Sequence, residues 1–139
     1  MKSASSILSL AIIAGLSQSA YAADVKAANA SKGEILVLLS SENVMQLADG
    51  KTEPTGYYLN EFGVPAKALV DAGYKLVLAT PKGNAPSVDK KSVIPQYFDG
   101  GESQMRDIQT FVASIEGIDD TLSLSEVIGQ GLEEFEGVF

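Results

Sequence analysis

Few side chains in this sequence could carry out nucleophilic or acid–base chemistry, because it contains neither cysteine nor histidine. Without a thiolate or an imidazole, the chain alone cannot form a Cys-His or Ser-His-Asp site, and it lacks the common zinc ligands except carboxylate. Carboxylates remain, and Glu61 is the one that we single out. Glu61 lies close to a predicted helix start. The helix dipole favours a negative charge there, so the presence of a glutamate can be explained without any function.

Two other groups of residues are of types that could bind an anion or a metal ion. Gly100-Gly101 precedes a predicted helix and could bind an anion through free N–H groups. No strand leads into it and no lysine follows, as a phosphate-binding loop requires, so a plain turn is favoured. The pairs Asp119-Asp120 and Glu133-Glu134 match no calcium-loop spacing and are predicted to be surface carboxylates. We therefore predict no metal and no cofactor.

The charge of the chain argues against nucleic acid and anionic membranes as partners. Its formal net charge is −8, and phosphate binding needs clustered lysine and arginine. Lys90-Lys91 is the only adjacent pair of basic residues, and it reads as part of a solvated loop.

The N-terminus has the pattern of a secretory signal peptide. Lys2 is followed by an apolar run over residues 7–16 and by small residues at Ala20 and Ala22. The run is too short for a permanent membrane span, although an uncleaved anchor or a buried helix is the alternative. We predict a signal peptide over residues 1–22, export to the periplasm or medium, no membrane association after cleavage, and a flexible lead-in over residues 23–33.

The elements that would position Glu61 are two buried strands and a helix. Residues 34–40 and 74–80 are continuous apolar runs, typical of strands covered on both faces of a parallel sheet. Residues 65–73 begin with proline and end with glycine, which predicts a short helix between the strands. Residues 57–62 could form a turn before it, which Pro65 would end or kink. Strand, helix and strand together indicate a right-handed parallel βαβ unit.

The rest of the chain extends this pattern. Residues 41–56 read as a polar loop with a turn at Asp49-Gly50, and residues 102–115 as a helix with one apolar face. Residues 119–134 favour a short strand or turn and a short helix, before a third buried run at residues 135–139. We expect one domain over residues 34–139, the N-terminal part of an α/β, flavodoxin-like three-layer sandwich whose parallel sheet is truncated after about three strands.

One stretch resembles a known family. It begins with Thr-Gly-Tyr-Tyr-Leu-Asn-Glu-Phe at residues 55–62 and continues through Pro65 to an apolar strand that ends in Ala-Thr-Pro-Lys-Gly at residues 79–83. Asp89, Ser92 and the closing residues 132–139 add to the match. The chain resembles the ThiJ/PfpI superfamily, which is similar in fold to class I glutamine amidotransferases, and within it the branch of glutathione-independent glyoxalases (glyoxalase III) and heat-inducible chaperones.

The resemblance implies a role for Glu61. In that family an acidic residue from the first βα region works beside a nucleophilic cysteine, a histidine and a glycine loop, and only the acidic residue has a counterpart here, Glu61. A carboxyl near a thiol can accept or share its proton. A complete parent would act on small dicarbonyls such as methylglyoxal, or on their protein adducts, and a homodimer would be compatible with it.

The same resemblance leaves the activity of this chain open. Lacking the cysteine and the histidine, it is expected to be inactive alone. The alternative is a non-catalytic, chaperone-like or interaction module, because the family includes chaperones and an open sheet edge can pair with other chains.

Overall fold

The computed structural model describes residues 31–139. The predicted signal peptide and most of the predicted lead-in, residues 23–30, lie outside the described residues. Within residues 31–139, no helix combines the length and the apolar character needed to cross a membrane.

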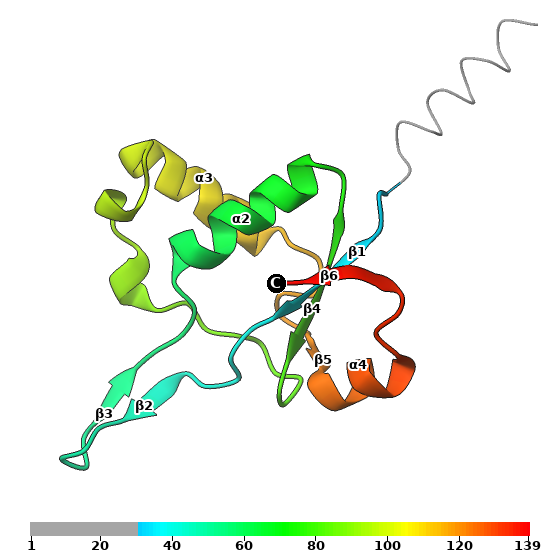
Figure 1. Cartoon of the computed structure of the whole chain (residues 1–139). Helices are drawn as coiled ribbons and strands as arrows, with labels where there is room; N and C mark the ends of the chain where they lie inside the picture. Colours follow the sequence, from blue (N-terminus) through cyan, green and yellow to red (C-terminus); the bar gives the residue numbers. More distant parts are fainter. Residues whose placement is uncertain (1–30) are drawn as a thin grey trace, which may run out of the picture. The chain divides into compact units, whose positions relative to one another are not determined.

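A four-stranded parallel sheet forms the centre of the domain (Figure 1). Its strands, in spatial order, are β5 (Leu122–Ser123), β4 (Lys75–Thr80), β1 (Glu34–Leu38) and β6 (Phe135–Val138). The three apolar runs of the sequence are therefore strands, as predicted, and β1 lies between β4 and β6. The third run is not buried as expected, because β6 lies at the edge of the described sheet and Val138 is 67% exposed. The described sheet has four strands rather than about three, because two residues after position 121 pair with the end of β4.

The helix between β1 and β4 begins earlier than predicted. Helix α2 runs over Leu59–Asp71 and contains Pro65 in its interior, whereas the sequence indicated a helix starting at Pro65. A proline inside a helix removes one backbone hydrogen bond. Leu59 and Phe62 are almost fully buried, and this burial stabilises the additional turn that precedes the proline.

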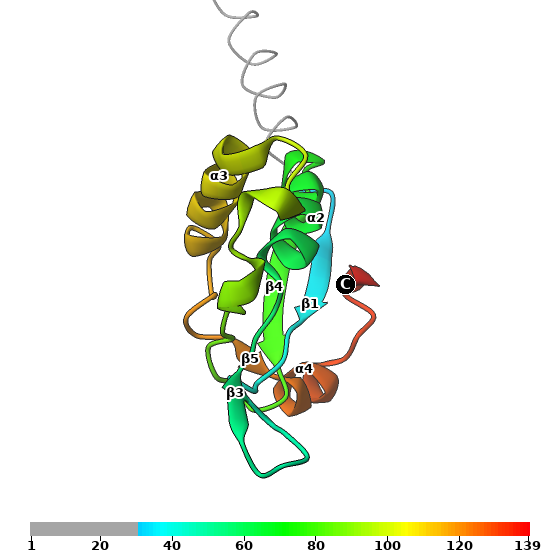
Figure 2. The same cartoon turned by 90° about the vertical axis from the view of Figure 1, so that its left-hand side faces the viewer.

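A hairpin takes the place of part of the predicted polar loop. β2 (Val44–Gln46) and β3 (Thr52–Pro54) pair antiparallel, and Gly50 adopts a φ of 78° in the turn between them. The turn at Asp49-Gly50 was predicted, but the strands were not. Three-residue strands with mostly exposed side chains carry too little alternation to be recognised. The hairpin projects from the body of the domain in both views (Figures 1 and 2).

Helices cover both faces of the sheet, which makes three layers. Helices α2 and α3 (Gly101–Ala113) lie side by side on one face (Figure 2). Their main core includes Val37, Leu78, Phe62, Ala66, Ile108 and Val112. Helix α4 (Leu124–Gln130) covers the other face, where Val127 packs with Leu36 and Ala79. The chain is thus an α/β three-layer sandwich on a parallel sheet, of the flavodoxin-like class, as the sequence predicted.

Candidate functional site

The segment before α2 is fixed to a distant loop by two backbone hydrogen bonds. The N–H of Tyr57 donates to the carbonyl of Ser87 at 2.9 Å, and the N–H of Asp89 donates to the carbonyl of Tyr57 at 2.9 Å. This parallel bridge leaves no room for a side chain at Gly56, since a Cβ there would lie 2.0 Å from the carbonyl oxygen of Ser87. The entry to α2 is therefore held by backbone that lies about thirty residues further along the chain.

A buried serine completes the N-terminus of α2. The N–H of Leu59 donates to the hydroxyl of Ser92 at 2.8 Å, and that hydroxyl donates to the carbonyl of Asp89 at 2.6 Å. Tyr58, at the N-cap position, offers no side-chain hydrogen bond. Helix starts need acceptors for their free N–H groups, and Ser92 supplies one from outside the helix.

Glu61, the predicted site residue, lies in the first turn of α2 and lines an open cavity of about 270 Å³. The walls come from the end of β1 and the residue after it (residues 37–39), from Tyr57 and Tyr58, and from Phe139. The ends of β1 and β6 lie next to each other at this cavity, because the N–H of Leu38 donates a hydrogen bond to the carbonyl of Phe139 at 2.9 Å. Glu61 thus faces the carboxyl ends of two neighbouring parallel strands, the place where open α/β sheets bind ligands.

The groups around this cavity limit its chemistry to proton transfer and hydrogen bonding. Glu61 is exposed and its carboxylate forms no hydrogen bond within residues 31–139. The other lining residues with polar side chains are Tyr57 and Tyr58. A carboxylate can accept a proton from a bound molecule, but no serine, threonine or lysine lines the cavity. A nucleophile would have to come from outside these lining residues.

Comparisons with known proteins find similarity among solved structures. No family model matches the sequence, and no curated protein matches it. Among solved structures, the chain is similar to glyoxalase III from Candida albicans, with a TM-score of 0.46 and 23% sequence identity. The match covers 68% of this chain and 38% of that one, so the chain spans well under half the length of that protein. The fold assignment made above rests on the strand order and layers of this chain itself.

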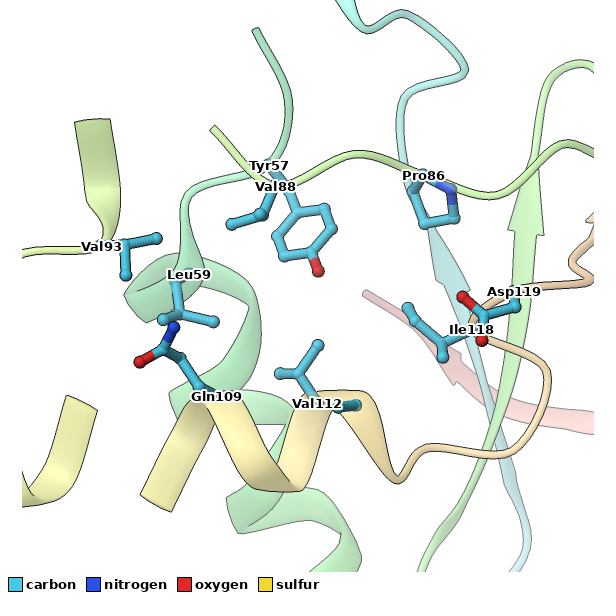
Figure 3. A pocket seen from close by; sticks show the side chains of 10 residues that line it. Tyr57, Leu59, Pro86, Val88, Val93, Gln109, Val112, Ile118 and Asp119 are labelled. Carbon is cyan, nitrogen blue, oxygen red and sulfur yellow. The ribbon is translucent and has the colours of Figure 1, made fainter. Parts of the chain in front are cut away.

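A second cavity, of about 310 Å³, was not anticipated from the sequence. It lies between α3 and the loop of residues 85–93, and its polar side chains are Tyr57, Gln109 and Asp119 (Figure 3). These three residues are far apart in the sequence and share no motif, so only the fold brings them together. Tyr57 lines both cavities.

The weaker candidates from the sequence lie apart from the Glu61 cavity. The N–H of Gly100 donates to the side-chain oxygen of Gln104 at 2.8 Å, so this N–H at the start of α3 already has a hydrogen-bond acceptor within the protein. Glu133 and Glu134 are exposed. Asp119 belongs to the second cavity, and no group of three or more carboxylates within residues 31–139 is arranged to hold a metal ion.

Proposed function

We propose that this chain contributes the acidic residue of a ThiJ/PfpI-like site that acts on small dicarbonyls such as methylglyoxal, with Glu61 as the proton shuttle. The observation that carries the proposal is the position of Glu61, whose cavity lies at the carboxyl ends of β1 and β6. The motif at residues 55–62, which places a glutamate directly after the first strand and loop, supports the same assignment.

The proposed reaction converts methylglyoxal and water to lactic acid. A thiolate adds to the aldehyde carbon and forms a hemithioacetal. A carboxylate removes the proton from that carbon and returns it to the neighbouring carbon, which leaves a lactoyl thioester. Water then cleaves the thioester and regenerates the thiol. Glu61 would carry the proton, but the 139 residues contain no cysteine, so the thiol must come from outside them and these residues alone should form no lactate.

Binding tests the location of this site without requiring turnover. Hydroxyacetone, a carbonyl compound of the same size, is titrated into the full isotope-labelled chain while amide resonances are followed by NMR. We expect shifts at Tyr58, Glu61 and Phe139, and weaker binding in Glu61→Gln. Glu116→Gln is the matched control, since Glu116 is also exposed but lies outside the cavity lining. Shifts that avoid the cavity would contradict the proposal.

Supplying the missing thiol tests the chemistry. The full chain is mixed with methylglyoxal and 2-mercaptoethanol, which form the hemithioacetal spontaneously, and the thioester is followed by its ultraviolet absorbance. General-base catalysis is worth roughly a hundredfold or more in intact sites, so we expect a measurable acceleration that Glu61→Gln removes and Glu116→Gln retains. Equal rates with and without wild-type protein would count against Glu61 as a proton shuttle.

A further inference from the structure

The second cavity is built as a small, mostly apolar binding site. Its walls include Leu59 at the start of α2, Val88 and Val93 from the facing loop, and Val112 and Ile118 from α3 and the turn after it (Figure 3). Leu59 and Val112 are almost fully buried. The volume of about 310 Å³ is at the lower end of the range for ligand pockets, which suits a single ring with a short substituent.

Three polar side chains at this cavity have unused hydrogen-bonding capacity. The side chains of Tyr57, Gln109 and Asp119 form no hydrogen bond within residues 31–139, although each lines the cavity. The hydroxyl of Tyr57 is directed into the space between Val112 and Asp119 (Figure 3). Burial and, secondarily, the charge of Asp119 raise the pKa of Tyr57, so this hydroxyl is protonated at neutral pH and keeps both its donor and its acceptor capacity.

The charge of the cavity is negative. Asp119 is its one acidic residue, and no lysine or arginine lines it. The chain as a whole has a net charge of −8, which raises the local concentration of cations and lowers that of anions. An apolar body and a positively charged group are therefore the complementary features of an occupant.

We propose that this cavity binds a small apolar organic cation, with its ring among the valines and its ammonium group paired with the carboxylate of Asp119. The hydroxyl of Tyr57, which points toward the Asp119 side of the cavity, can accept a further hydrogen bond from the ammonium, whereas Gln109 lies at the opposite side beside Leu59 (Figure 3). This site is distinct from the proposed Glu61 site, because a dicarbonyl carries no positive charge and Glu61 does not line this cavity.

A ligand series of constant shape tests the role of charge. Benzylamine, benzyl alcohol and benzoate are each titrated into the full labelled chain, and the amide resonances of Val88, Val93 and Val112 are followed. Because a partly exposed ion pair adds up to roughly fivefold in affinity, we expect benzylamine to bind several times more tightly than benzyl alcohol, with benzoate weakest. Added salt should reduce only the benzylamine affinity.

Adjacent aspartates provide matched variants. Asp119→Asn should bring benzylamine down to the affinity of benzyl alcohol, whereas Asp120→Asn, equally exposed but outside the cavity lining, should leave the preference intact. The proposal is overturned if the three compounds bind alike, if the shifts lie away from the valines, or if both variants behave identically. The salt series on wild-type protein decides the matter even if a variant fails to fold. None of these outcomes depends on Glu61.

Discussion

The hydroxyl of Ser92 accepts a hydrogen bond from the backbone N–H of Leu59 at 2.8 Å, and the two residues are 33 positions apart in the sequence. A helix N-cap is ordinarily the residue just before the helix. Here a long-range contact performs that task, and it links the loop of residues 85–92 to the first turn of α2, where Glu61 lies. The stability of α2 and the position of its carboxylate therefore depend on the same hydroxyl.

Removing that hydroxyl should destabilise the domain. Ser92→Ala leaves the buried N–H of Leu59 without an acceptor, at a cost of about 1–3 kcal/mol in the free energy of unfolding. The carbonyl of Asp89 keeps the backbone N–H of residue 92 as a donor. Urea denaturation measures the loss. Ser103→Ala is the control, because Ser103 is exposed in α3 and its hydroxyl forms no hydrogen bond within the described residues. Equal midpoints for the two variants would show that the Ser92 contact contributes little.

The packing of α2 against α3 should tolerate no side chain at Gly63. A Cβ at this position would lie 2.3 Å from Cγ2 of Ile108 and 3.0 Å from Cγ2 of Val112. We expect Gly63→Ala to lower the free energy of unfolding by about 1–3 kcal/mol through overpacking. Thermal unfolding followed by circular dichroism measures the change.

A second helical glycine gives the opposite prediction. At Gly129 of α4 an added Cβ meets nothing within 4 Å. Gly129→Ala should therefore raise the free energy of unfolding by about 0.5–1 kcal/mol, because alanine has less conformational entropy to lose on folding. A loss of stability at this position, as large as at Gly63, would mean that crowding does not explain the effect of either substitution.

Stability should depend on pH through the capping box of α4. Hydrogen bonds from the Ser123 side chain and then from its backbone N–H lower the pKa of Glu126. Because the folded-state pKa lies below the unfolded one, the stabilisation is present above the unfolded pKa and is lost as the pH falls through the folded value. Glu126→Gln should therefore reduce the decrease in the free energy of unfolding that occurs when the pH is lowered.

Chemical denaturation across a pH series from neutral to strongly acidic checks this. The wild-type and Glu126→Gln curves should converge at the acid end, where the glutamate is protonated and resembles glutamine. Glu134→Gln serves for comparison, since the carboxylate of Glu134 forms no hydrogen bond within residues 31–139. A constant gap between wild type and Glu126→Gln at every pH would rule out the capping carboxylate as its cause.

Sequence periodicity was sufficient for the elements whose burial is local and continuous. The runs that became β1 and β4 are largely buried between helices on both faces, and the apolar stripe of α3 follows helical spacing, so their residues alone indicate their structure. The run that became β6 also indicated a strand, although that strand is only partly buried. The start of α2 could not be predicted in this way. It depends on Ser92 and on the bridge between Tyr57 and Val88, which are long-range contacts without a local pattern.

The candidate site could likewise be predicted only in part from the sequence. Glu61 could be named from the motif around it, because its neighbours are adjacent in the sequence. Its cavity could not, since Phe139 joins it only through the pairing of β6 with β1. The second cavity takes Tyr57, Gln109 and Asp119 from three separate segments, and neither their residue types nor their spacing indicates that they line the same cavity.

Tyr57 lines both cavities, so a ligand that fixes or moves its ring in one cavity can alter the shape of the other. A molecule that holds this ring in one position on the Asp119 side also sets the shape available on the Glu61 side. Thermodynamic linkage then requires the effect to be mutual, with the same coupling free energy in each direction. One aromatic side chain thus connects the occupancy of a cavity lined by α3 to that of one at the ends of β1 and β6.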